Sequence, residues 1–68
     1  MSEEKHPLTE VTVRLIGVDG NAFNLIGLTR DALRRGGHAA LIERFTREAT
    51  SGDYLNVIST IMRYCHVE

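Results

Sequence analysis

The chain has 68 residues, 43% of them hydrophobic and 25% charged, and its formal net charge at pH 7 is −1. This composition is typical of one small globular domain, and the near-neutral charge argues against a nucleic-acid or membrane partner. No apolar run approaches the roughly 18 residues of a membrane span, and the first residues lack signal-peptide character. We therefore expect a cytoplasmic protein with no membrane partner.

The length of the chain favours self-association. A domain of this size buries only about 60% of its unfolded surface, so disulfides, a metal or oligomerisation usually add stability. Cys65 is the only cysteine, which excludes an intramolecular disulfide. Oligomerisation, as a homodimer, is then the leading expectation.

The N-terminal part predicts a flexible tail over residues 1–10, followed by a single domain over 11–68. Apolar and polar residues alternate over Val11–Leu15, which is typical of a half-buried strand. Such a strand needs a backbone partner, which is another subunit, water or the C-terminus. Residues 65–68 alternate again, and they fit the end of a helix, a loose tail or a strand beside Val11–Leu15.

A helix is predicted over Ala22–Arg35. It follows the turn sequence Asp19-Gly20-Asn21, with Asn21 as N-cap, and Gly36-Gly37 ends it with one glycine in the left-handed conformation. Asp31 is spaced to pair with Arg35 in this helix.

Two more helices are predicted, from His38 or Ala39 to Thr50 and from Tyr54 to about Tyr64. Gly52 is expected to end the former and Asp53 to cap the latter. The fold expected is an α+β domain, one N-terminal β-strand followed by three α-helices, in which a short C-terminal strand would pair with the first. The expected core contains Val13, Leu15, Leu25, Ile26, Leu33, Leu41, Phe45, Ile58, Ile61 and Met62.

Three motifs together carry a resemblance. They are Gly17-x-Asp19-Gly20-Asn21-Ala22-Phe23, the block Ala32-Leu33-Arg34-Arg35, and Glu48-Ala49-Thr50-Ser51-Gly52-Asp53-Tyr54 followed by Met62. With this pattern, the chain after its tail resembles a group of small uncharacterised bacterial and phage-encoded proteins. Because that group has no established activity, the resemblance implies one compact domain and no catalytic, cofactor-binding or metal-binding residues.

No pattern for catalysis or metal binding is found. Cys65 and His66 are adjacent, but zinc sites use recurring pairs at chelating spacing, which His6 and His38 do not supply. Cys65 falls on the apolar side of the last helix, which predicts a buried, inert thiol. We expect no enzyme, no cofactor and no small-molecule substrate.

The favoured function is therefore a small non-enzymatic interaction module that self-associates or binds another protein. Phe23 falls on the polar side of its helix, where it either presents an aromatic contact or folds back over the Gly20 turn. Two contact surfaces are proposed without ranking, the strand residues Val11, Val13 and Leu15 and the helix face of Phe23, Gly27, Arg30 and Arg34. The alternative, which is disfavoured, is nucleic-acid binding by Arg30, Arg34, Arg35, Arg44 and Arg47.

Overall fold

The computed structural model describes residues 7–17 and 20–68. The chain forms, in order, β1 (Thr12–Val13), α1 (Ala22–Arg35), the 3₁₀ turn η1 (Ala39–Leu41), α2 (Ile42–Ala49), α3 (Tyr54–Tyr64) and β2 (His66–Val67). The predicted fold class is confirmed, including the C-terminal strand.

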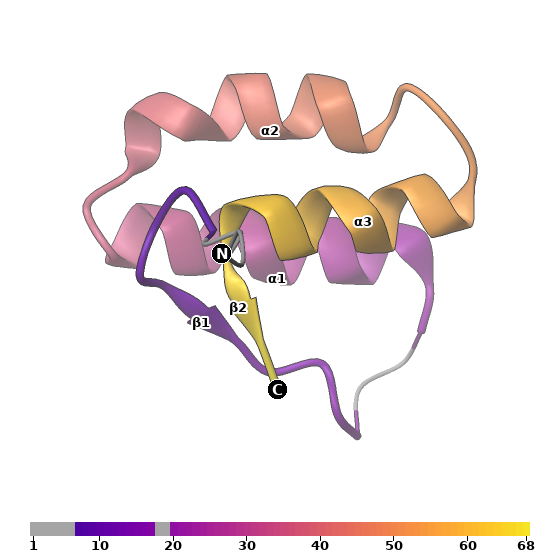
Figure 1. The fold of residues 1–68 in the computed structure, drawn as a ribbon, viewed down its shortest axis with the longest axis horizontal. Helices are drawn as coiled ribbons and strands as arrows, with labels where there is room; N and C mark the ends of the chain where they lie inside the picture. The colour runs from indigo at the N-terminus through magenta and orange to yellow at the C-terminus, as the bar shows by residue number, and fades with distance from the viewer. Residues whose placement is uncertain (1–6, 18–19) are drawn as a thin grey trace, which may run out of the picture.

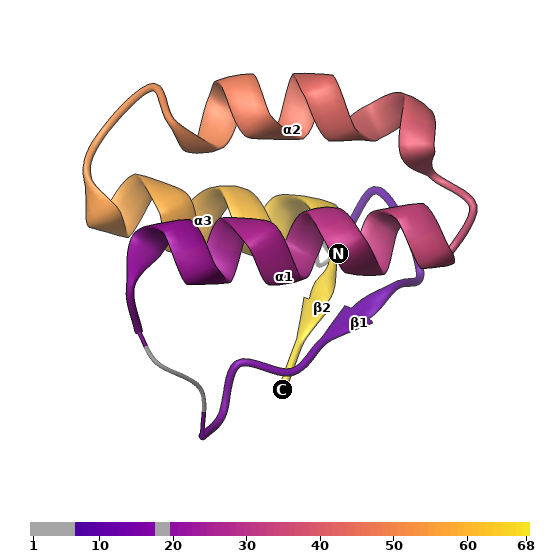
Figure 2. The ribbon, with the colours of Figure 1, turned by 180° about the vertical axis from the view of Figure 1, so that it is seen from behind.

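The three α-helices form two layers (Figures 1 and 2). α1 and α3 lie side by side, with α2 across one face of the pair and the two strands on the other. The buried core lies between these elements. It contains Val13, Leu25, Ile26, Ala32, Leu33, Phe45, Ala49, Val57, Ile61, Tyr64 and Cys65.

β1 and β2 pair in parallel, with Thr12 opposite His66 and Val13 opposite Val67. The backbone pairing continues beyond the short strands, because the Leu15 N–H donates to the Glu68 carbonyl at 2.7 Å. The partner for the predicted Val11–Leu15 strand is therefore the C-terminus of the same chain. This result removes the need for a second subunit to complete the ladder.

The residues before β1 are held against the end of α3. The backbone N–H groups of Leu8 and Thr9 donate to the carbonyls of Arg63 and Tyr64, at 2.9 and 3.1 Å. The Thr9 hydroxyl also donates to the Tyr64 carbonyl at 2.7 Å, and Thr9 is buried. Of the tail predicted over residues 1–10, residues 1–6 lie outside the described residues.

α1 begins and ends as its sequence predicts. The side chain of Asn21 accepts hydrogen bonds from the N–H groups of Phe23 and Asn24, which satisfies amides that have no carbonyl partner within the helix. At the other end, Gly37 has φ +85°, the left-handed conformation that glycine adopts without steric cost. In the predicted turn, Asp19 lies outside the described residues.

The second predicted helix is divided into η1 and α2. No side chain caps its start at His38, and the chain enters through a 3₁₀ turn in which the Leu41 N–H donates to the His38 carbonyl at 2.9 Å. α2 ends at Ala49, one residue before the predicted Thr50, and Thr50 is its C-cap. The Asn56 amide reaches back from α3 and donates to the Glu48 carbonyl at 2.8 Å, which satisfies a carbonyl at the end of α2.

The buried side of α3 is shifted from the one predicted, although Ile61 is buried as expected. The prediction that Met62 belongs to the core is wrong, since Met62 is 57% exposed, while Thr60, which the predicted core does not include, is fully buried. Burial costs Thr60 little because its hydroxyl donates to the Asn56 carbonyl at 2.7 Å. Tyr64, also fully buried, packs against Phe45 of α2 and defines the inward side of α3.

Candidate interaction site

One side of α1 carries an exposed aromatic ring. Phe23 is 84% exposed, which is more than any other large hydrophobic side chain that the structure describes, so it does not fold back over the Gly20 turn. At about 100° per residue, it lies within an arc of about 60° with Gly27, Arg30 and Arg34. We call these four residues the Phe23 face.

Nothing in the described part of the chain requires a glycine at position 27. It lies in the interior of α1, where glycine costs roughly 1 kcal/mol relative to alanine. A Cβ built at Gly27 would meet no described atom within 4 Å, and the residue has no positive φ. The flat spot beside Phe23 therefore leaves room for another molecule to approach the helix backbone closely.

Three of the five candidate arginines lie together. Arg30 and Arg34 of α1 and Arg47 of α2 line one groove of about 590 Å³, with Ala39, Ile42, Glu43 and Thr46. Arg47 pairs with Glu43 at 3.4 Å, four residues apart on the same helix. Arg30 makes no ion pair with any residue in the described ranges.

The predicted pair of Asp31 with Arg35 is wrong. Asp31 accepts instead from Arg34 at 3.3 Å. Arg35 lies on the other flank of α1, where its side chain lines a separate groove with the segment 7–12. The ion pair therefore forms three residues apart, on the side of α1 that faces the α2 groove.

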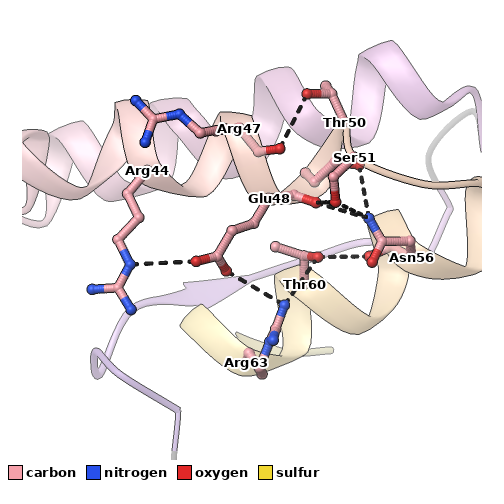
Figure 3. A network of polar contacts seen from close by, with 9 residues as sticks. Arg44, Arg47, Glu48, Thr50, Ser51, Asn56, Thr60 and Arg63 are labelled. Carbon is pink, nitrogen blue, oxygen red and sulfur yellow. Dashed lines mark hydrogen bonds and ion pairs between the residues drawn. The ribbon is translucent and has the colours of Figure 1, made fainter.

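Arg44 lies on the other side of α2 (Figure 3). Its side chain donates to Glu48 at 3.3 Å, and the second carboxylate oxygen of Glu48 accepts from Arg63 of α3 at 3.4 Å. These arginines are more than half exposed, so each pair contributes only about 0–1 kcal/mol. The five arginines proposed for nucleic acid therefore do not share one face.

The strand residues of the first proposed surface point inward. Val13 is 3% exposed, and Val11 and Leu15 are half-buried against the core. Gly36 lets this segment approach α1, because a Cβ there would lie 2.6 Å from Cγ2 of Val11. Of the two proposed surfaces, only the Phe23 face presents its side chains to solvent.

A second aromatic residue lies near Phe23. Tyr54, the first residue of α3, is 46% exposed and lines a shallow pocket of about 270 Å³ with Phe23, Ile26 and Val57. A Cβ at Gly20 would lie 3.2 Å from the Tyr54 hydroxyl. The sequence places Tyr54 on the apolar arc of its helix and carries no signal that its ring lies beside α1.

The remaining candidate groups are buried or dispersed. Burial raises the pKa of the Cys65 thiol, which is 1% exposed and therefore neutral at physiological pH. His38 and His66 line the groove beside the segment 7–12, together with Glu10. Within the described residues, no three His, Cys, Asp or Glu side chains are arranged to hold a metal ion.

Protein-family models, curated proteins and solved structures were compared with the chain, and none of them matches it. Among the described residues, no helix is both long enough and apolar enough to cross a membrane.

Proposed function

We propose that this chain is a small non-enzymatic interaction module that binds a protein partner through the Phe23 face. The observation that carries the proposal is the exposure of Phe23 beside Gly27. Aromatic and arginine side chains are enriched at protein interfaces, where they supply most of the binding energy. Phe23, with Arg30 and Arg34, supplies both types around a flat spot.

The position of Phe23 supports a contact role more than a structural one. Leaving its ring 84% exposed forgoes the roughly 1.5–3 kcal/mol that a buried phenylalanine contributes. Gly27 lowers the stability of the same helix turn and fills no steric need in the described chain. Two residues, one helix turn apart, that do not stabilise the monomer are explained together by one partner that covers them.

Site-specific photo-crosslinking in cells that express the protein tests the proposal. A photoreactive phenylalanine analogue at position 23 should give a covalent adduct of defined mass, either with another protein or with a second copy. The same analogue at Leu55, which is 73% exposed on α3, is the matched control. The proposal would be contradicted if position 23 gave no adduct, or if positions 23 and 55 gave the same amount of adduct.

Nucleic-acid binding remains the alternative, and one observation favours it. Arg30, Arg34 and Arg47 line a single groove, and three phosphate contacts would give a salt dependence with a slope of about −2.7 on duplex DNA. Glu43 lies in the same groove, and its negative charge would repel a phosphate backbone. A mobility shift at low salt with wild type, but not with Arg30→Gln, would support this alternative.

A further inference from the structure

We infer that the partner of the Phe23 face is a second copy of this chain, bound with the two α1 helices antiparallel and crossing at Gly27. This inference rests on the proposed function, because it names the occupant of the same face. Three features of the face support it: the spacing of its residues, the charge of Arg30, and the space at Gly27.

The spacing makes the face complementary to itself. Phe23 precedes Gly27 by four residues, about 6 Å along the helix, and Arg30 follows Gly27 by three residues, about 4.5 Å. A two-fold axis perpendicular to the helices at the level of Gly27 therefore brings Phe23 of one copy level with Arg30 of the other. The two residues then differ by only about 1.5 Å in height along the helix. The contact occurs twice, once on each side of the axis.

The chemistry of this contact is favourable. A guanidinium group over an aromatic ring is attracted by the negative face of the ring, and arginine is the cation most often found there. Arg30 makes no ion pair with any residue that the structure describes, so its charge is not committed to a neighbour. In the antiparallel arrangement, the two Arg30 side chains lie on opposite sides of the axis and do not oppose each other.

Gly27 provides the close approach that such a crossing needs. Packed helix axes usually lie 8–10 Å apart, and the separation depends on the side chains at the contact. Because a Cβ at Gly27 would meet open space, the helix surface is flat at the crossing point. The net charge of −1 per chain adds little repulsion between two copies.

The dimer is expected to be weak. A helix of 14 residues is about 21 Å long, so a crossing of two such helices covers less than the roughly 800 Å² per partner of a standard interface. Self-association should accordingly appear only toward high protein concentration, and its dependence on single side chains should be strong.

Sedimentation equilibrium of the full chain over a hundredfold concentration range measures the association. We expect a monomer–dimer equilibrium, which Phe23→Ala and Arg30→Gln weaken by about tenfold or more and which Leu55→Ala leaves unchanged. Circular dichroism of each variant shows whether the fold is retained. Association that responds to Leu55→Ala and not to Phe23→Ala would overturn the inference.

Disulfide trapping tests the geometry. Gly27→Cys places a thiol at the two-fold axis and should oxidise to a covalent dimer, whereas Ser59→Cys, exposed on α3, should not. Cys65 is 1% exposed, so the unmodified chain serves as the blank. Equal trapping at positions 27 and 59 would overturn the antiparallel arrangement.

The two proposals fail separately. If the purified chain is monomeric throughout and position 23 crosslinks to a different protein in cells, the inference of a second copy is wrong and the proposed function stands. If position 23 gives no adduct of any kind and the chain is monomeric, both are wrong.

Discussion

The aromatic rings of Phe45 and Tyr64 meet edge to face between α2 and α3, with their centroids 5.4 Å apart and their planes at 74°. Both side chains are fully buried, and such a pair contributes about 0.5–1.5 kcal/mol beyond its buried area. The contact joins α2 and α3, which are also linked by the ion pair of Glu48 with Arg63. It therefore sets which side of α3 faces the core.

Replacing Phe45 by alanine should largely unfold the protein. Removing a fully buried phenylalanine side chain costs about 3–5 kcal/mol, and a chain of this length is stable by only roughly 3–10 kcal/mol in total. Urea unfolding followed by circular dichroism measures the loss. Phe23→Ala is the matched control, because it removes the same atoms from an exposed site and should change the free energy of unfolding by no more than about 0.5 kcal/mol.

Because Tyr64 is buried, we expect the protein to lose stability at alkaline pH. Burial, and then the negative charge of Glu48, raise the pKa of Tyr64 above 10.0. The folded state then holds the phenolic proton more tightly than the unfolded state does. This contribution to stability is fully present below about pH 10 and is lost as the pH rises through the folded-state pKa.

Tyr64→Phe isolates that effect. The Tyr64 hydroxyl has no hydrogen-bond partner among the described residues, so its removal should change stability at pH 7 by less than about 1 kcal/mol. The buried Cys65 thiol, whose pKa is also raised, acts in the same direction in both proteins. Thermal melts between pH 7 and 11 should show a steeper alkaline loss for wild type than for the variant; parallel curves would contradict the prediction.

Thr9 should stabilise the protein through its hydroxyl. Its Oγ1 donates to the Tyr64 carbonyl at 2.7 Å, which joins the segment before β1 to the end of α3, and it accepts from the Val11 N–H within that segment at 3.1 Å. Thr9→Val keeps the shape of the side chain and should cost about 1–2 kcal/mol in urea unfolding. Thr12→Val, at an exposed position of β1, should cost much less; equal losses would show that the hydroxyl bonds contribute nothing.

Local signals in the sequence predict most of the helix boundaries. Asn21 and Asp53 cap the helices that follow them, because a short polar side chain before an apolar periodic run satisfies the first free amides wherever the helix packs. Phe23 is exposed because the apolar arc of α1 lies on the other side of that helix. These features depend on residues within a few positions of one another.

Features set by tertiary contacts could not be predicted in the same way. Met62 belongs to an apolar arc by spacing alone, but the pairing of Tyr64 with Phe45 turns α3 so that Thr60 is buried and Met62 is exposed. The ion pair of Glu48 with Arg63 joins residues of different helices, for which helical spacing rules give no signal. The same limit applied to Tyr54, whose place beside Phe23 depends on how α3 meets α1.

Replacement of Gly27 in α1 and of Gly36 at its C-cap by alanine should change the stability of the protein in opposite directions. Gly27→Ala adds a methyl group to open space in a helix interior and should raise the free energy of unfolding by about 0.5–1 kcal/mol. Gly36→Ala places a Cβ 2.6 Å from Cγ2 of Val11, so the Val11 side chain or the helix end must move, and overpacking of this kind costs about 1–3 kcal/mol. Urea unfolding at the lowest practical protein concentration, where monomers dominate, measures both. A loss of stability in Gly27→Ala under those conditions would mean that the glycine serves the monomer, and its presence would then not indicate close approach of a partner.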